Sequence, residues 1–278
     1  MNKQLAEKLA GLIRDTSSSL PDDVSKALGK ALKQEARGTS AAVVLETILK
    51  NCRLARRKQV PLCQDTGTLT FFISDKLRRR VTSAAVKQAV ALATERGYLR
   101  KNCIDSVSGR SYDDNCADGA PVIHYTDDVP AGTVTLLMKG GGSENMSRQY
   151  SLPDAELGAG RDLDGVKACV HDAVRKIQGY GCAPGILGIA IGGDRATGFE
   201  AAKLTLLRKT GQRAAGELGE LELEILKDAN RSGIGPMGLG GRTTLLDAHI
   251  VARPRLPASF FVTIAYMCWA CRRRTITL

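Results

Sequence analysis

Apolar residues recur along the first 58 residues with the spacing of one helical face, and this spacing predicts three helices. Residues 24–36 and 41–55 follow the helical rhythm, and Leu20-Pro21 marks a stop between the first two helices. We therefore expect residues 1–58 to form a helical scaffold without chemistry of its own. In the first helix, over residues 2–14, the apolar positions are Leu5, Leu9, Leu12 and Ile13.

After residue 58 the pattern changes to short apolar runs that alternate with helical segments and glycine-rich turns. This order predicts a mixed α/β fold in one domain over residues 1–278, in which lobes 59–160 and 161–278 follow the helical scaffold. The expected strands cover residues 69–73, 122–125, 132–138, 186–191, 243–251 and 260–267. The expected helices cover residues 83–96, 163–179 and 217–229, and a further one begins at residue 198.

The stretch PLCQDTGT, directly before the first expected strand, combines a thiol, an amide, a carboxylate and two hydroxyls. Pro61 and Gly67 form turns and flank the polar residues, so we expect a loop that leads into a core strand. Cys63 can bind a soft metal and Asp65 can move a proton. Two interpretations remain open at this point: an active-site loop, or a capped turn with a buried cysteine, since cysteine is among the most buried residue types.

The positive charge of the chain is typical of nucleic-acid-binding proteins, but its composition disfavours this function. Lys and Arg number 40 against 29 Asp and Glu, which gives a net charge of +11. Only 4% of the residues are aromatic, and neither arginine–aromatic interleaving nor zinc-finger spacing occurs. We expect the basic runs at residues 56–58, 78–80 and 272–274 to be solvated faces, and a basic field can equally steer a small dicarboxylate.

The sequence predicts a cytoplasmic protein without a membrane span. No stretch contains 18 uninterrupted apolar residues, and the N-terminus lacks the apolar core of a secretory signal. Eight scattered cysteines in such a protein argue against a disulfide framework. The single CxxC pair, Cys268 and Cys271, is a weak signal for zinc because no second pair accompanies it.

Two glycine-rich stretches follow expected strands without matching a nucleotide-binding motif. Residues 138–145 end in GGGSEN, which suits a bend whose backbone N–H groups approach an anion or, alternatively, a flexible hairpin turn. The GK[ST] ending of a phosphate loop is absent there. Residues 186–193 lead from a strand into a Gly-Gly turn and a helix, but they lack GxGxxG.

Five motifs occur in one order along the chain: PLCQDTG, KGGGSEN, YGCAPGILGIAIGG, GIGPMGLGG and CWACRR. Their combination resembles the alpha subunit, or N-terminal half, of class I iron–sulfur fumarases, and it is similar to the related L-tartrate dehydratase alpha subunits. The resemblance covers nearly the whole chain. It implies a hydro-lyase that hydrates fumarate reversibly to L-malate, with a [4Fe-4S] cluster whose fourth iron holds the dicarboxylate substrate.

The resemblance also implies the ligands of the cluster. The three ligand motifs of the family fall on Cys63, Cys182 and Cys268, each at the edge of an expected strand. Three thiolates leave one iron of a cubane without a protein ligand, and that iron can act as a Lewis acid. Cys271 stands where relatives vary, and it is not counted as a ligand.

The same resemblance assigns the substrate-binding residues. Gln64 and Asp65 line the substrate site, and Asp65 participates in proton transfer. Arg100 matches an arginine that binds a substrate carboxylate, and Gly142 matches a glycine whose backbone contacts the substrate. A guanidinium and backbone N–H groups at a glycine turn are suitable partners for carboxylates, which agrees with these roles.

Two departures from the family pattern qualify this assignment. Residues 115–119 read NCADG in place of an NTGDN-like stretch, so Arg110 is a further candidate for substrate contact. Single-chain relatives continue beyond the position of Leu278, so we expect a hetero-oligomer with a beta subunit that carries the second half of the active site. The alternatives are an L(+)-tartrate dehydratase alpha subunit and a non-catalytic interaction protein that lost the cluster; retention of all three cysteines disfavours the latter.

Overall fold

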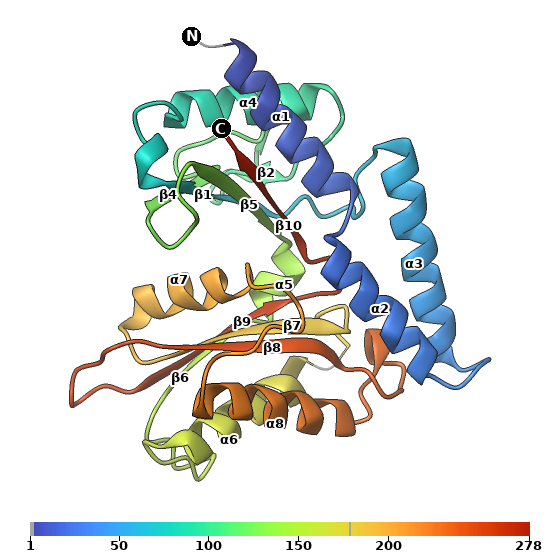
Figure 1. The fold of residues 1–278 in the computed structure, drawn as a ribbon, viewed down its shortest axis with the longest axis vertical. Helices are drawn as coiled ribbons and strands as arrows, with labels where there is room; N and C mark the ends of the chain where they lie inside the picture. Colours follow the sequence, from blue (N-terminus) through green and yellow to red (C-terminus); the bar gives the residue numbers. More distant parts are fainter. Residues whose placement is uncertain (1–2, 178) are drawn as a thin grey trace. The chain divides into compact units, whose positions relative to one another are not determined.

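The computed structural model describes residues 3–177 and 179–278, and its contacts divide the chain into two compact units (Figure 1). Unit 1 contains residues up to 21, residues 50–141 and residues 270–278. Unit 2 contains residues 22–49 and 142–269. Each unit is therefore assembled from segments that are distant in the sequence.

The three N-terminal helices are present as predicted: α1 (Lys3–Ser18), α2 (Asp22–Gln34) and α3 (Ser40–Lys58). Helix α1 continues past the expected end at residue 14, because hydroxyl groups in its last turn donate to carbonyl groups three or four residues earlier. Thr16 Oγ1 donates to the carbonyl of Leu12 at 2.7 Å, and Ser18 Oγ donates to that of Arg14 at 2.8 Å. The helical N-terminal region is thus confirmed.

Unit 1 is built on a four-stranded sheet in the order β10-β5-β1-β4. Strand β1 runs parallel to β4 and antiparallel to β5, and β10 closes the other edge as the antiparallel neighbour of β5. Helices α1 and α4 cover one face of this sheet (Figure 1). The bounds are β1 (Thr68–Ser74), η1 (Asp75–Leu77), α4 (Ser83–Glu95), β2 (Cys103–Ile104), β3 (Ser111–Tyr112), β4 (Val122–Thr126), β5 (Thr133–Lys139) and β10 (Arg272–Thr277).

The basic run at residues 272–274 is not the solvated face that the sequence predicts. Arg272 and Arg273 are only 2% and 8% exposed, because β10 pairs with β5 and packs against α1. Arg274 Nη2 donates to Ser19 Oγ at 3.0 Å. The runs at residues 56–58 and 78–80, in contrast, are exposed as expected.

Unit 2 is built on a second four-stranded sheet in the order β6-β9-β7-β8. Helices α6 and α8 pack on one face of it, and α7 packs on the other (Figure 1). The close approach of α7 requires Gly188 on β7, since a Cβ at this position would collide with the carbonyl of Ala202. The bounds are α5 (Gly141–Asn145), β6 (Arg148–Ser151), α6 (Leu163–Ile177), β7 (Gly185–Ile191), α7 (Arg195–Thr205), α8 (Glu217–Arg231), η2 (Pro236–Gly238), β8 (Leu245–Ala252) and β9 (Phe261–Met267).

Two local predictions in this unit are wrong in detail. Helix α7 begins at Arg195 and not at residue 198, because the side chain of Asp194 caps it by accepting from the N–H groups of Ala196 and Thr197. The GGGSEN stretch was expected to bend, and it forms the short helix α5 instead. Among the described residues, no helix has the length and apolar character needed to cross a bilayer.

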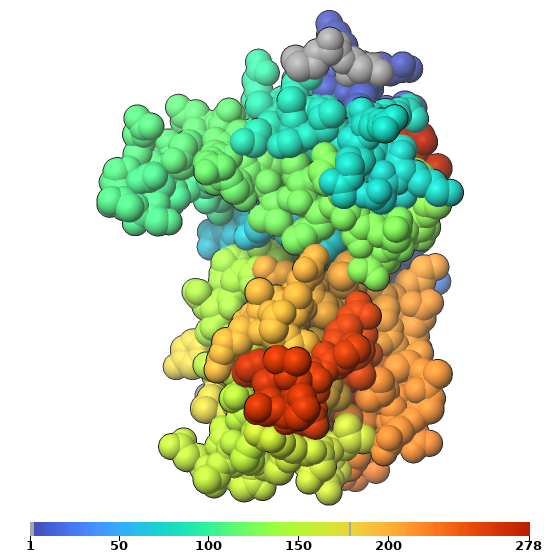
Figure 2. All heavy atoms as spheres, turned by 90° about the vertical axis from the view of Figure 1, so that its left-hand side faces the viewer, coloured from blue at the N-terminus to red at the C-terminus, as the bar shows by residue number. Residues whose placement is uncertain are grey.

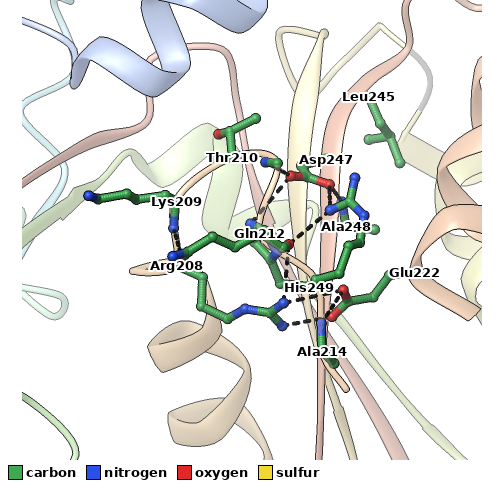
Figure 3. A network of polar contacts seen from close by, with 12 residues as sticks. Arg208, Lys209, Thr210, Gln212, Ala214, Glu222, Leu245, Asp247, Ala248 and His249 are labelled. Carbon is green, nitrogen blue, oxygen red and sulfur yellow. Dashed lines mark hydrogen bonds and ion pairs between the residues drawn. The ribbon is translucent and has the colours of Figure 1, made fainter. Parts of the chain in front are cut away.

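A buried glutamate on α8 joins this helix to β8 and to the loop that precedes α8 (Figure 3). Glu222 is fully buried, and it lies on the face of α8 whose other residues are mostly apolar. Its carboxylate accepts from Arg208 Nη1 at 2.7 Å and from the N–H groups of Ala214 and Ile250 at 2.9 and 2.6 Å. A buried carboxylate with these partners is fully satisfied.

Asp247 on β8 forms the second centre of the same network (Figure 3). Its fully buried carboxylate accepts from Gly211 N at 2.6 Å and from Arg213 Nη1. Burial raises the pKa of Asp247, and the hydrogen bond from Gly211 together with the charge of Arg213 opposes this rise. The 206–214 loop is thereby fixed to the edge strand of the sheet.

We expect Glu222→Ala to lower the free energy of unfolding by about 3–5 kcal/mol, because it removes the carboxylate partner of Arg208 and the acceptor of the Ala214 and Ile250 N–H groups. Urea denaturation followed by circular dichroism measures this change. Glu224→Ala is the matched control on the same helix: Glu224 is half-exposed, pairs with Lys167 at 2.9 Å, and is expected to contribute only about 0–1 kcal/mol. Equal losses in the two variants would contradict the role of the network.

Candidate functional site

The loop before β1 presents Cys63 and Gln64 at the surface of unit 1. Gln64 is exposed and Cys63 is partly exposed. The preceding residue is fixed through both of its backbone groups: Leu62 N donates to the carbonyl of Ser17 at 2.8 Å, and Asn51 Nδ2 donates to the carbonyl of Leu62 at 2.9 Å. The loop therefore has a defined base from which these two side chains project.

The carboxylate of Asp65 lies against the glycine turn that follows β5. A Cβ at Gly140 would lie 2.6 Å from Asp65 Oδ2, so only glycine leaves room for the carboxylate at this position. Gly67 has a φ of 74°, and a Cβ there would collide with the carbonyl of Lys139. Two glycines thus allow the loop before β1 to approach the end of β5 closely, with the Asp65 carboxylate beside Gly140.

Arg100 is held next to this loop through its backbone. Thr66 is buried, and its hydroxyl donates to the carbonyl of Arg100 and accepts from the N–H of Arg100, both at 3.0 Å. Asn115 Nδ2 donates to the same carbonyl at 2.9 Å. The side chain of Arg100 is exposed. A cation and a carboxylate, Arg100 and Asp65, are therefore placed on neighbouring loops.

Sequence reasoning did not assign a role to Thr66 or Asn115. Asn115 also accepts from the N–H groups of Asn102 and Cys103, so one side chain fixes the segment on both sides of Lys101. The backbone of Asn115 is left-handed, with a φ of 59°, a conformation that asparagine adopts more readily than most residues. No local sequence signal distinguishes it, because the partners of its side chain lie 12 to 21 residues away.

A pocket of about 350 Å³ opens beside Asp65 within unit 1. This volume is in the range of small-molecule sites, roughly 300–1,000 Å³. Strand β2 forms part of one wall. In Figure 2 the segment around the hairpin of β2 and β3, coloured teal to green, stands out from the rest of the unit. The residues that surround the pocket include Asp65, Leu69, Cys103, Asn115, Val122 and Gly141.

Gly142 lies on α5, directly after the glycines that contact Asp65. It is exposed, and a Cβ at this position would meet no atom within 4 Å. Sterically, therefore, Gly140 is the glycine that the Asp65 carboxylate requires, although the family resemblance points to Gly142. Lys203 Nζ and Glu144 Oε1 form an ion pair at 2.8 Å, which joins α5 to α7.

Cys182 and Cys268 lie on adjoining segments of unit 2. Trp269 N donates to the carbonyl of Cys182 at 3.3 Å. Cys182 is exposed and has a φ of 52°, a left-handed conformation that is strained for cysteine and is typical of functional sites. Gly181 and Gly185 flank it, and a Cβ at either glycine would collide with the ring of Tyr266. The loop thus wraps closely around one aromatic ring.

Tyr266 is a second feature of the segment around Cys182 and Cys268, and its hydroxyl indicates whether a polar group fits there. Its hydroxyl is buried and has no hydrogen-bond partner among the described residues. Burial raises its pKa well above the ordinary value, and the charges of the Cys268 and Cys182 thiolates add to this rise. A buried phenol near two thiols fits a site that holds an electron-rich group.

Other cysteines differ from these candidates in environment. Burial raises the pKa of Cys52 and of Cys116 to about 11, and that of Cys169 to about 12, so these thiols remain protonated near neutral pH. Cys271 is completely buried. Within residues 3–177 and 179–278, no three His, Cys, Asp or Glu side chains cluster around a single metal-ion position.

Comparison with known proteins identifies relatives along the whole chain. The model of the fumarate hydratase (Fumerase) family matches residues 6–277. The chain is 44% identical to a putative fumarate hydratase class I of Geobacillus stearothermophilus, over 98% of this chain and 54% of that protein. It therefore spans about half the length of this relative.

Two further relatives have nearly the same length as the chain. A putative L(+)-tartrate dehydratase subunit alpha of Methanocaldococcus jannaschii is 34% identical over 97% of this chain and 96% of that protein. The L(+)-tartrate dehydratase subunit alpha of Escherichia coli K12 is 29% identical, over 98% of this chain and 90% of that protein.

Proposed function

The chain belongs to the fumarate hydratase family, and we propose that it is the cluster-bearing alpha subunit of a hydro-lyase that converts fumarate reversibly to L-malate. The observation that carries this proposal is the placement of Asp65 and Arg100 on loops that Thr66 joins, together with a pocket of about 350 Å³ that Asp65 lines. A carboxylate for proton transfer and a guanidinium for a substrate carboxylate are the groups that such a reaction requires.

We infer that Cys63, Cys182 and Cys268 hold a [4Fe-4S] cluster. Each cysteine of a cubane binds a different iron, so the ligands do not need to converge on one metal position. The exposure of Cys182, the partial exposure of the other two thiols, and the buried hydroxyl of Tyr266 near two of them fit this group. When bound, the cluster supplies an iron without a protein ligand that polarises substrate oxygens.

The residues of the chain then have separate tasks. The Arg100 guanidinium binds one carboxylate of the substrate in a bidentate manner, and the amide of Gln64 hydrogen-bonds to the substrate. Asp65, whose Oδ2 atom faces Gly140, takes up or releases the proton. Backbone groups at Gly142 contact the second carboxylate.

We further infer a heteromeric enzyme in which a second subunit completes the active site. Two relatives of similar length are named as alpha subunits, and the chain spans 54% of the fumarate hydratase relative. The cytoplasm suits such an enzyme, because a reducing compartment keeps cluster-binding thiols available.

Co-purification with a candidate beta subunit, followed by anaerobic cluster reconstitution, iron analysis and a fumarate hydration assay, tests the proposal. We expect iron bound to this chain and hydratase activity only in the complex. A complex that binds iron yet hydrates no dicarboxylate would reject the proposed activity, and a chain that binds no iron would favour a non-catalytic interaction protein.

Dehydration of L(+)-tartrate is the second candidate activity. The chain covers 96% and 90% of two tartrate dehydratase alpha subunits, whereas it covers 54% of the fumarate hydratase relative. Turnover of fumarate and of L-tartrate by the same reconstituted complex decides between the two. Activity with tartrate alone would reject fumarate as the substrate.

Gly140→Ala is expected to lower kcat/KM by about 10²-fold, since a Cβ would displace the Asp65 carboxylate by a distance on the order of 1 Å. Steady-state hydration of fumarate by the complex measures this loss. Gly11→Ala on α1 is the matched control, because a Cβ at this position would meet no atom within 4 Å and the residue lies outside the candidate site. A loss in Gly140→Ala no larger than that in Gly11→Ala would contradict the steric argument.

A further inference from the structure

Two serine hydroxyls extend the hydrogen bonding of β9 beyond the end of its partner strand β6. Pairing between the two strands reaches only as far as Arg148, because the chain before it belongs to a turn and to α5. In an antiparallel pair, every second residue directs its N–H toward the same neighbour. The next two such groups are those of Tyr266, which donates to Ser147 Oγ, and of Cys268, which donates to Ser143 Oγ, both at 3.2 Å.

The positions of Ser143 and Ser147 allow both hydroxyls to accept from N–H groups of the same strand. Ser143 lies on α5, and Ser147 lies two residues beyond its end, in a turn that Ser147 N closes by donating to the carbonyl of Glu144 at 3.0 Å. The two hydroxyls accept from N–H groups that are two residues apart on one strand, a separation of about 6.4–6.8 Å. Ser147 Oγ also donates to the carbonyl of Ser143 at 3.2 Å. Helix α5 and the turn after it thus replace a strand as the neighbour of β9.

Of the two serines, Ser143 bears directly on the proposed cluster site, because its partner is Cys268. The pairing of β9 with β7 ends at Met267, one residue earlier. Beyond that point, Ser143 Oγ binds the N–H of Cys268, and the next residue, Trp269, donates to the carbonyl of Cys182. Ser143 is buried, and the ion pair between Lys203 and Glu144 holds α5 against α7. Cys268 is therefore positioned by a rigid element.

We propose that Ser143 is a positioning residue that fixes the backbone of Cys268, so that its thiol is presented to the iron–sulfur cluster. The inference rests on the proposed function, since it concerns the same site. Ser143 directly follows Gly142, so one short helix carries both the glycine assigned to the substrate and the hydroxyl that holds a cluster ligand. An alanine at residue 143 keeps the helix but lacks the acceptor for the Cys268 N–H.

The first test uses the cluster-free chain under anaerobic conditions. The rate at which iodoacetamide labels Cys268 reports how strongly the backbone of this cysteine is fixed. Mass spectrometry measures this rate, and the labelling of Cys63 in the same molecules is the reference. We expect Ser143→Ala to raise the relative labelling rate by about two- to tenfold, the change that corresponds to one lost hydrogen bond. Ser143→Thr, which retains a hydroxyl, should label like the wild type. Ser147→Ala removes the acceptor of the Tyr266 N–H and acts on Cys268 only through the carbonyl of Ser143, so it should have the smaller effect.

The second test uses the reconstituted complex and follows iron loss to a chelator. Ser143→Ala is expected to shorten the half-life of the bound iron by about two- to tenfold, and Ser143→Thr is expected to restore it. Wild-type values of both labelling and iron loss in Ser143→Ala, or equal effects in Ser147→Ala, would overturn the proposal. If Ser143→Ala fails to fold, rapid hydrogen exchange of the Cys268 amide in the folded wild-type chain would overturn it as well.

The two proposals fail in different ways. A wild-type complex without iron would reject the proposed cluster, while the labelling of Cys268 would still decide whether Ser143 positions it. A wild-type complex with iron, in which Ser143→Ala changes neither the labelling of Cys268 nor the loss of iron, would reject only the role of Ser143.

Discussion

Replacing Cys63, Cys182 or Cys268 with serine is expected to remove the iron–sulfur cluster and, with it, all measurable hydratase activity of the assembled complex. Serine preserves the size of the side chain, but its hydroxyl is a hard and protonated group in place of a soft thiolate, which iron–sulfur clusters require. Iron and acid-labile sulfide per chain, together with the visible absorbance of the reconstituted complex, measure the loss.

Cys52→Ser and Cys116→Ser are the matched controls for this experiment. Burial raises the pKa of both thiols to about 11, so they are protonated near neutral pH and are poor metal ligands. Both variants should keep the iron content and the activity of the wild type. An unchanged brown chromophore in Cys63→Ser would contradict the ligand assignment of this residue.

Most helices could be predicted because the signals that define them are local. The apolar spacing predicts a helix over residues 83–96, and α4 covers Ser83–Glu95, with Thr82 as its cap: the hydroxyl of Thr82 accepts from Ala85 N. Strands β1 and β5 were predicted for the same reason, as short apolar runs that are bounded by turn residues. Here propensity and tertiary packing favour the same structure.

Strands β6 and β10 were missed because their stability depends on distant partners. The arginines at the start of β10 are buried by pairing with β5 and by packing against α1, although the segments are more than 130 residues apart in the sequence. Arginine-rich residues without alternation carry no strand signal of their own. The short helix α5 was missed because three glycines disfavour a helix, while contacts of Ser143 and Glu144 with β9 and α7 support it.

The loop that carries the candidate site could be inferred from the sequence, but the hydrogen bonds that hold its residues in place could not. The loop with Cys63 and Asp65 stands out through residue types and flanking turns, and it does precede β1. Thr66 reaches Arg100, 34 residues further along the chain, through hydrogen bonds that no local pattern reveals. The roles of the cysteines and of Arg100 remain predictions, drawn from the resemblance to the family.

Asp65→Asn is expected to lower kcat of the assembled complex by about 10²–10⁴-fold, the usual contribution of a general acid or base. The amide has the size of the carboxylate, so it fits the space beside Gly140, but it cannot take up the proton. Because Thr66 holds the backbone of Arg100 independently of this side chain, substrate binding should be retained. Steady-state hydration of fumarate, with kcat and KM determined separately, measures the effect.

Asp127→Asn is the control that separates loss of a catalytic proton from a general loss of negative charge, because Asp127 is exposed and follows β4, away from the glycine turn. Its kcat should equal that of the wild type, and both variants should bind as much iron as the wild type. An Asp65→Asn complex with full iron content and unchanged kcat would exclude Asp65 from proton transfer. A large rise in KM at constant kcat would instead assign Asp65 to substrate binding alone.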